Sequence, residues 1–84
     1  MAEGYRKGES RRDDIVEAAR QLYEERGLSR TTVRAIAERV GVTRTLFYHY
    51  FADKDAVTSA VLDDYVADYL EALRLWNESR RPGD

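Results

Sequence analysis

Cysteine is missing from this 84-residue sequence, and proline and histidine occur once each. Without cysteine the chain can form neither a disulfide framework nor a thiolate metal site. No apolar run exceeds three residues, as at Ala60-Val61-Leu62, whereas a membrane span needs roughly 20 apolar residues and a signal peptide a stretch of about 7–15. We therefore expect one small, soluble domain in the cytoplasm, with no membrane partner.

An excess of positive charge is also missing, since the formal net charge is −2. Its distribution is uneven: residues 1–54 contain 11 Lys and Arg against 9 Asp and Glu, a net of +2, whereas residues 55–84 contain 3 against 7, a net of −4. The first two thirds of the chain can therefore face phosphates although the whole chain is acidic. Charge alone does not decide for or against a nucleic-acid partner.

No arrangement of residues points to catalysis. The sequence has no phosphate-binding loop, no Ser-His-Asp set and no glycine-rich cradle. His49 is the only histidine, and its one potential co-ligand at i+4 is Asp53, which is too little for a metal site. We expect no enzymatic activity, no metal and no cofactor.

What the sequence does contain is helical periodicity. Ser10 and Asp13 form a capping-box pattern at the start of a helix expected over residues 11–26, and Gly27 supplies a left-handed stop. Its apolar residues recur at spacings of three and four, as in an amphipathic helix: Ile15, Ala18, Ala19, Leu22 and Tyr23. The polar residues 1–9 are expected to form a mobile arm.

Three further helices are expected. The second follows a cap at Thr31 or Thr32 and ends at Gly41, the third spans residues 43–50, and the fourth begins at a cap on Asp53. The apolar positions of the fourth helix extend far along the chain: Val57, Val61, Tyr65, Val66, Tyr69, Leu70, Leu73 and Trp76. The predicted fold is all-α, a three-helix head followed by a long fourth helix.

Residues 33–50 fit the spatial template of a helix-turn-helix. Two helices that cross steeply over a tight turn need a small residue at the crossing, which Ala37 provides, and a left-handed residue at the end of the first helix, which Gly41 provides. Apolar residues at the required offsets then lock the two helices together: Ile36, Val40, Val42, Phe47 and Tyr50. Seven positions match one template, which is a fairly specific signal.

Locking Phe47 and Tyr50 inward places the polar residues of the third helix on its outer face. These are Thr43, Arg44, Thr45, Tyr48 and His49, with Leu46 at the border. Arginine can bond guanine O6 and N7 together, threonine and leucine can contact the thymine methyl, and Tyr and His can reach phosphates. This face has no acid, although Asp and Glu make up 16 of the 84 residues, so it suits the major groove of DNA.

Two groups beside this face can bind the DNA backbone. The amides of Thr32 and Val33 at the start of the second helix, with the hydroxyl of Thr31, can hold a phosphate. Lys54, in the first turn of the fourth helix, opposes the helix macrodipole at a cost of about 0.3–1 kcal/mol. A phosphate partner would explain a lysine at that position.

Three stretches, residues 31–37, 41–44 and 47–54, resemble the head of TetR-family transcriptional regulators. The most distinctive part is the aromatic run at 48–51 followed by Lys54. The resemblance implies a homodimer that reads an inverted repeat in double-stranded DNA, usually as a repressor released by a small-molecule inducer. It further implies that the chain is the DNA-binding head of a bacterial regulator, located in the cytoplasm and on the nucleoid when bound to DNA.

The resemblance also implies roles for individual residues. Thr43, Arg44 and Thr45 fall on base-reading positions, and the positions that contact phosphates in the family are occupied here by Thr31, Tyr48, Tyr50 and Lys54. The family commonly has Gly-Thr where this chain has Thr45-Leu46, a departure that favours apolar contact at Leu46.

The resemblance divides the chain into an arm at residues 1–9, a DNA-binding domain at 10–54 and a fourth helix with a frayed tail at 55–84. Family members continue into a larger C-terminal domain for dimerisation and inducer binding. We therefore expect this chain to be a fragment or truncated product, and an inducer only in a full-length protein.

The apolar face of the fourth helix is longer than a three-helix head can cover. Its candidate interface residues are Tyr65, Val66, Tyr69, Leu70, Leu73 and Trp76. It can dock on the missing C-terminal domain or on a second copy, and for the isolated chain we favour self-association. The alternative function is a helical protein-interaction module that uses this face without DNA. The weak net charge favours that alternative, and the acid-free outer face of the third helix opposes it.

Overall fold

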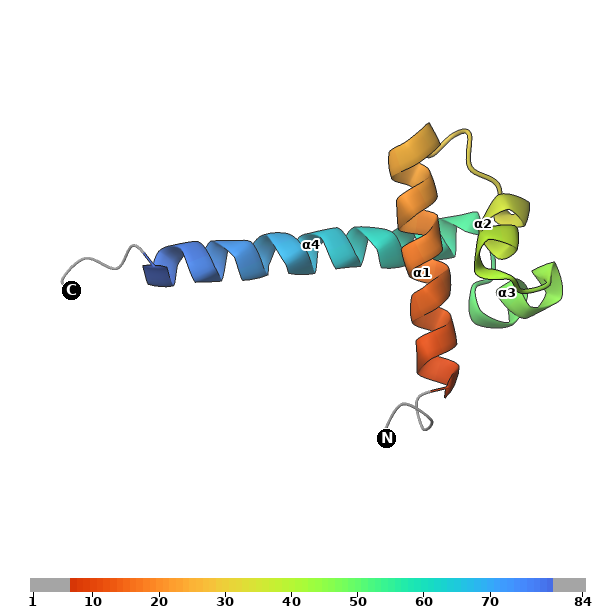
Figure 1. The fold of residues 1–84 in the computed structure, drawn as a ribbon, viewed down its shortest axis with the longest axis horizontal. Coiled ribbons are helices and arrows are strands. Elements are labelled where there is room, and N and C mark those ends of the chain that lie inside the picture. The colour runs from red at the N-terminus through yellow and green to blue at the C-terminus, as the bar shows by residue number, and fades with distance from the viewer. Residues whose placement is uncertain (1–6, 80–84) are drawn as a thin grey trace.

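The computed structural model describes residues 7–79, which form four helices and no strand. The helices are α1 (Lys7–Arg26), α2 (Val33–Val40), α3 (Arg44–Tyr50) and α4 (Lys54–Ser79). α1 crosses the N-terminal part of α4, α2 and α3 lie beside that crossing, and the rest of α4 projects away from the other helices (Figure 1). The all-α architecture expected from the sequence, a three-helix head followed by a long fourth helix, is confirmed.

The start of α1 differs from the expectation. The helix begins at Lys7, so Ser10 lies inside it and the expected cap at Ser10 was wrong. Lysine, glutamate and arginine are good helix formers, and they surround Gly8, whose cost of about 1 kcal/mol they outweigh. The mobile arm was therefore wrong for residues 7–9. Residues 1–6 of that arm, and the expected frayed end at 80–84, lie outside the described residues.

The other three helix starts are capped as the sequence indicates. In each case a side-chain oxygen accepts a hydrogen bond from the backbone amide three residues further on: Thr32 Oγ1 from Ala35 at 3.0 Å, Thr43 Oγ1 from Leu46 at 3.0 Å, and Asp53 Oδ1 from Ala56 at 2.9 Å. Each bond satisfies an amide that has no partner within its own helix.

The turn between α2 and α3 depends on Gly41. Its φ of 88° lies in the left-handed region, which residues with a Cβ enter only at a cost. This conformation brings the amides of Gly41 and Val42 back onto the carbonyl of Ala37, at 2.9 and 3.0 Å. Because one carbonyl accepts both hydrogen bonds, the turn closes in the compact form that a helix-turn-helix needs.

The core lies where α1, α2, α3 and the first turns of α4 meet. Its buried members are Ile15, Val16, Ala18, Ala19, Leu22, Ile36, Phe47, Phe51, Val57 and Val61. Complete burial of one large apolar side chain contributes roughly 1.5–3 kcal/mol, so this cluster holds the four helices of the head together. Within the described chain, no helix has the length and apolar character to cross a membrane.

Candidate nucleic-acid interface

The outer face of α3 is organised by Phe47. This side chain is fully buried, its ring lies 5.3 Å from that of Tyr48 in an edge-on arrangement and 5.9 Å from that of Phe51. Because Phe47 points into the core, the residues on the other side of the helix turn outward. Those exposed residues are Thr43, Arg44, Thr45, Tyr48 and His49, as expected, and Leu46 is half-buried at the border.

The side chain of Tyr50 is held in place by the core and by the ring of His49. It is half-buried, packs against the core, and its ring meets that of His49 edge-on at 5.1 Å. Its position matches the inward locking role inferred from spacing. His49 is held at the surface by the same ring contact.

The start of α2 is only partly as expected. Thr32 is exposed and caps the helix, and Val33 is half-buried. The amides at the start of a helix have no acceptor within the helix, so those of Thr32 and Val33 can receive an external anion. Thr31 differs: it is 1% exposed and its hydroxyl donates to the carbonyl of Gly27 at 2.9 Å. Its side chain does not reach the surface, and its expected phosphate contact is not available in this structure.

Lys54 has a partner that its sequence position did not reveal. Its Nζ donates to the carbonyl of Leu28 at 2.6 Å, and the same carbonyl accepts the amide of Thr31 at 3.2 Å. Lys54 thus ties the start of α4 to the turn that precedes α2. No ion pair involves it within the described residues, so its charge is not neutralised by a carboxylate.

Arg12 contributes a positive charge near the end of α3, a position that the spacing of residues in the sequence did not predict. Its guanidinium lies over the ring of Phe51, 5.0 Å from the centroid, in a cation–π arrangement. Phe51 is the C-cap residue that follows α3, so α1 brings an exposed positive charge to the junction of α3 and α4. Only the tertiary packing of α1 against this junction brings the two residues together.

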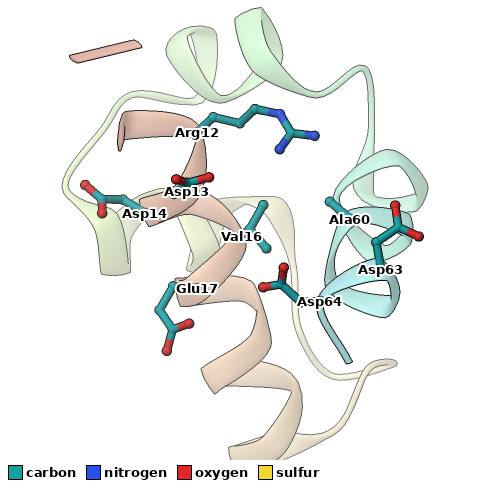
Figure 2. A pocket seen from close by; sticks show the side chains of 8 residues that line it. All are labelled: Arg12, Asp13, Asp14, Val16, Glu17, Ala60, Asp63 and Asp64. Atoms are coloured by element: carbon teal, nitrogen blue, oxygen red, sulfur yellow. The ribbon is translucent and has the colours of Figure 1, made fainter. Parts of the chain in front are cut away.

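A different surface lies between α1 and α4. Figure 2 shows a hollow of about 450 Å³ lined by Arg12, Asp13, Asp14, Val16, Glu17, Ala60, Asp63 and Asp64. Its five carboxylates would repel phosphate, and none of its lining residues comes from α2 or α3. Among the described residues no group of three or more acidic or histidine side chains is arranged to hold a metal ion. This hollow is therefore not part of the candidate nucleic-acid interface.

A cluster of charges joins α1 to α4 beyond the core. Arg20 lies over the ring of Tyr65 at 4.2 Å and pairs with Asp68 at 3.0 Å. The hydrogen bond to Asp68 raises the pKa of Arg20 above its ordinary value. The Tyr65 hydroxyl donates to the carboxylate of Glu24, which raises the pKa of Tyr65. These contacts hold α4 across α1.

The geometry defines a class of protein. Two capped helices cross over a glycine turn, and the second presents an acid-free polar face, which is the arrangement of a helix-turn-helix DNA-binding domain. Residues 15–61 match the family model described as "Bacterial regulatory proteins, tetR family". The chain belongs to this family, and it contains the family's DNA-binding domain.

Curated relatives agree with this assignment. The HTH-type transcriptional repressor KstR2 of Mycolicibacterium smegmatis is 39% identical over 57 residues, which are 68% of this chain and 28% of that protein. KstR2 of Mycobacterium tuberculosis is 40% identical over 63 residues, 75% of this chain and 31% of that protein. The HTH-type transcriptional regulator TtgR of Pseudomonas putida is 44% identical over 52 residues, 62% of this chain and 25% of that protein.

The chain therefore spans about a third or less of the length of these relatives. Both the family and the relatives are transcriptional regulators. The chain is accordingly a DNA-binding regulator domain and not an enzyme.

Proposed function

We propose that this domain recognises a specific sequence in double-stranded DNA by inserting α3 into the major groove, and that the regulator represses transcription. The observation that carries the proposal is the outer face of α3, where five exposed polar side chains stand without a single acid. Thr43, Arg44 and Thr45 read base edges, and Leu46 contacts a thymine methyl.

Contacts to the DNA backbone surround this reading surface. The amides at Thr32 and Val33 sit at the positive end of α2, where a phosphate is favoured. Tyr48, His49 and Tyr50 lie in the second half of α3 and are within the candidate backbone contacts. Lys54 brings an unneutralised ammonium to the start of α4. Thr31 contributes by closing the turn from inside, since its side chain is buried.

We further propose that two copies act together on an inverted repeat, with half-sites about 34–36 Å apart. Residues 10–54 form the DNA-reading domain, and residues 55–84 connect it to whatever carries the rest of the regulator's activity. An inducer, where there is one, binds outside the described head. The site of action is the bacterial cytoplasm, where the DNA is.

The alternative is a protein-interaction module that uses the exposed face of α4 and does not bind DNA. The exposure of that face favours it, with Tyr69 64% exposed and Leu70 57% exposed. This alternative gives no role to the acid-free face of α3, and we therefore prefer DNA binding.

The test is an NMR titration of the labelled chain with a DNA duplex at low salt. We expect chemical shift changes at residues 31–33 and 43–54 that fade as salt rises, because phosphate contacts release counterions. Arg44→Ala should reduce the changes, and the matched variant Arg74→Ala, on the projecting part of α4, should not. If no change occurs in those segments even at low salt, the interaction module becomes the better explanation.

A further inference from the structure

Two hydroxyl groups join the end of α1 to the first turns of α4, and neither belongs to the candidate interface. The Tyr23 hydroxyl oxygen and Thr58 Oγ1 are 2.7 Å apart, and Thr58 Oγ1 donates to the carbonyl of Lys54 at 2.7 Å. A threonine hydroxyl has a single proton. Because Thr58 directs its proton to Lys54, Tyr23 is the donor in the first bond. The hydroxyl of Tyr23 therefore acts on Lys54 through Thr58.

The hydrogen bonds continue through the turn between α1 and α2. Lys54 Nζ donates to the carbonyl of Leu28 at 2.6 Å, and the amide of Thr31 donates to the same carbonyl at 3.2 Å. The hydroxyl of Thr31 donates to the carbonyl of Gly27, and the amide of Gly27 donates to the carbonyl of Tyr23, both at 2.9 Å. The path thus returns to the residue where it began. It is called the Tyr23 network below and consists of Tyr23, Gly27, Leu28, Thr31, Lys54 and Thr58.

The Tyr23 network includes or adjoins two groups that the proposed function assigns to the DNA backbone. Lys54 is a member of the network. Thr31, another member, immediately precedes Thr32, the N-cap of α2, and the amides of Thr32 and Val33 are the candidate phosphate site. These two groups come from different helices, α2 and α4, so their spacing depends on tertiary contacts. The network supplies such contacts.

The side chains of the network are partly or fully shielded from water. Thr31 is 1% exposed, and Tyr23, Lys54 and Thr58 are half-buried. Hydrogen bonds are stronger where water is excluded, and bonds in a series polarise one another. The ring of Tyr23 also packs against the core. Phenylalanine at this position would keep that packing and remove only the hydroxyl.

We propose that Tyr23 is a positioning residue for DNA binding. Through Thr58 and Lys54, its hydroxyl sets where the ammonium of Lys54 lies relative to the amides at the start of α2. The phosphates of a duplex have fixed separations, so both groups bind together only when their own spacing matches. The consequence for DNA rests on the proposed function, whereas the network itself does not.

Amide hydrogen exchange of the DNA-free chain tests the network by itself. In Tyr23→Phe the Thr31 amide should exchange about three- to tenfold faster, the change expected when one hydrogen bond is lost. The Leu46 amide, which bonds Thr43 Oγ1 at 3.0 Å, is the internal control and should keep its rate. Equal acceleration of the two amides would show that the hydroxyl only stabilises the whole head. That result, or no acceleration at Thr31, would overturn the proposal.

Fluorescence anisotropy with a generic DNA duplex tests the consequence for binding. Tyr23→Phe should weaken binding about three- to tenfold. It should also reduce the slope of log K against log salt by up to about 0.9, because a displaced Lys54 no longer neutralises its phosphate. The matched control is Tyr65→Phe, which removes another tyrosine hydroxyl that bonds from α4 to α1, at Glu24, outside the network. It should leave affinity and slope unchanged. A wild-type slope for Tyr23→Phe, or equal losses for the two variants, would exclude the positioning role.

Variants of Thr58 test whether Tyr23 acts through this residue. Thr58→Ser keeps the hydroxyl and should bind DNA like the wild type, whereas Thr58→Val should match Tyr23→Phe. The double variant Tyr23→Phe/Thr58→Val should lose no more than either single variant, because both changes break the same path. Additive losses would mean that the two residues act separately and would overturn the proposal. If the wild type bound no duplex, the proposed function would fail, and the exchange rate of Thr31 would still decide whether Tyr23 holds the turn.

Discussion

Arg44 has no acidic partner among the described residues, in contrast to three other arginines of the head. Arg20, Arg34 and Arg39 each pair with a carboxylate, at 3.0, 3.1 and 2.9 Å. Arg44 is exposed at the start of α3. Its guanidinium is therefore ready to bond both acceptors on the major-groove edge of a guanine without first breaking an ion pair.

Arg44→Ala is expected to lose roughly 1–3 kcal/mol of binding free energy and to relax specificity at one base pair. Fluorescence anisotropy with the preferred duplex and a set of single-base changes would measure both effects. Arg74→Ala is the matched control, because it removes the same charge from the projecting part of α4. An Arg44→Ala variant that bound every duplex like the wild type would show that Arg44 does not read bases.

Lys54 is the second residue whose role can be measured directly. In the DNA-free chain its ammonium bonds the carbonyl of Leu28, and on DNA we expect it to contact a phosphate as well. Lys54→Ala should weaken binding to all sequences alike and reduce the slope of log K against log salt by about 0.9. Lys54→Arg should keep the slope. An unchanged slope for Lys54→Ala, with weaker binding, would mean that Lys54 acts only by holding the turn at Leu28.

At the scale of elements, the α2–α3 turn depends on one backbone conformation. A Cβ added to Gly41 would meet no atom within 4 Å, so only the left-handed φ of 88° opposes a side chain. Gly41→Ala should cost about 1–2 kcal/mol of stability, measured by urea denaturation. Gly41→Asn should cost less, because asparagine tolerates this conformation better. Equal stability of Gly41→Ala and wild type would show that the turn rearranges freely.

Helix ends and faces could be predicted from the sequence because their causes are local. Thr32, Thr43 and Asp53 each bond an amide three residues away, and Phe47 and Tyr50 pack inward and leave the other side of α3 outward. The start of α1 was misplaced because Ser10 offered a cap signal within residues that also favour a continuing helix.

The contacts that could not be predicted join parts of the chain that are distant in sequence. The carbonyl of Leu28 holds Lys54, the ring of Phe51 holds Arg12, and the ring of Tyr65 holds Arg20. Each depends on how two helices cross, which periodicity does not specify. The orientation of Thr31 could not be predicted either. Its hydroxyl points inward to the carbonyl of Gly27, which depends on how the segment between α1 and α2 is folded.

At the scale of the whole molecule, α4 is fixed to the head at more than one point along its length. Val57 and Val61 anchor the first turns of α4 in the core, and the Arg20–Tyr65 contact holds the next turns across α1. A contact that fixes the far part of α4 would therefore also fix the position of α3. Two heads held together, as the proposed function requires, would bind two half-sites with an effective concentration that a single head lacks.

The spacing of half-sites tests this joint action. An inverted repeat at the preferred spacing should bind roughly 10²–10⁴ times more tightly than one half-site, as measured by anisotropy. Inserting about 5 base pairs rotates one half-site to the opposite side of the duplex, since a turn is about 10–10.5 base pairs, and should reduce binding to that of a single half-site. If wild type tolerated the insertion without loss, the two heads would not be held in a fixed relation, and α4 would serve only as a flexible connection.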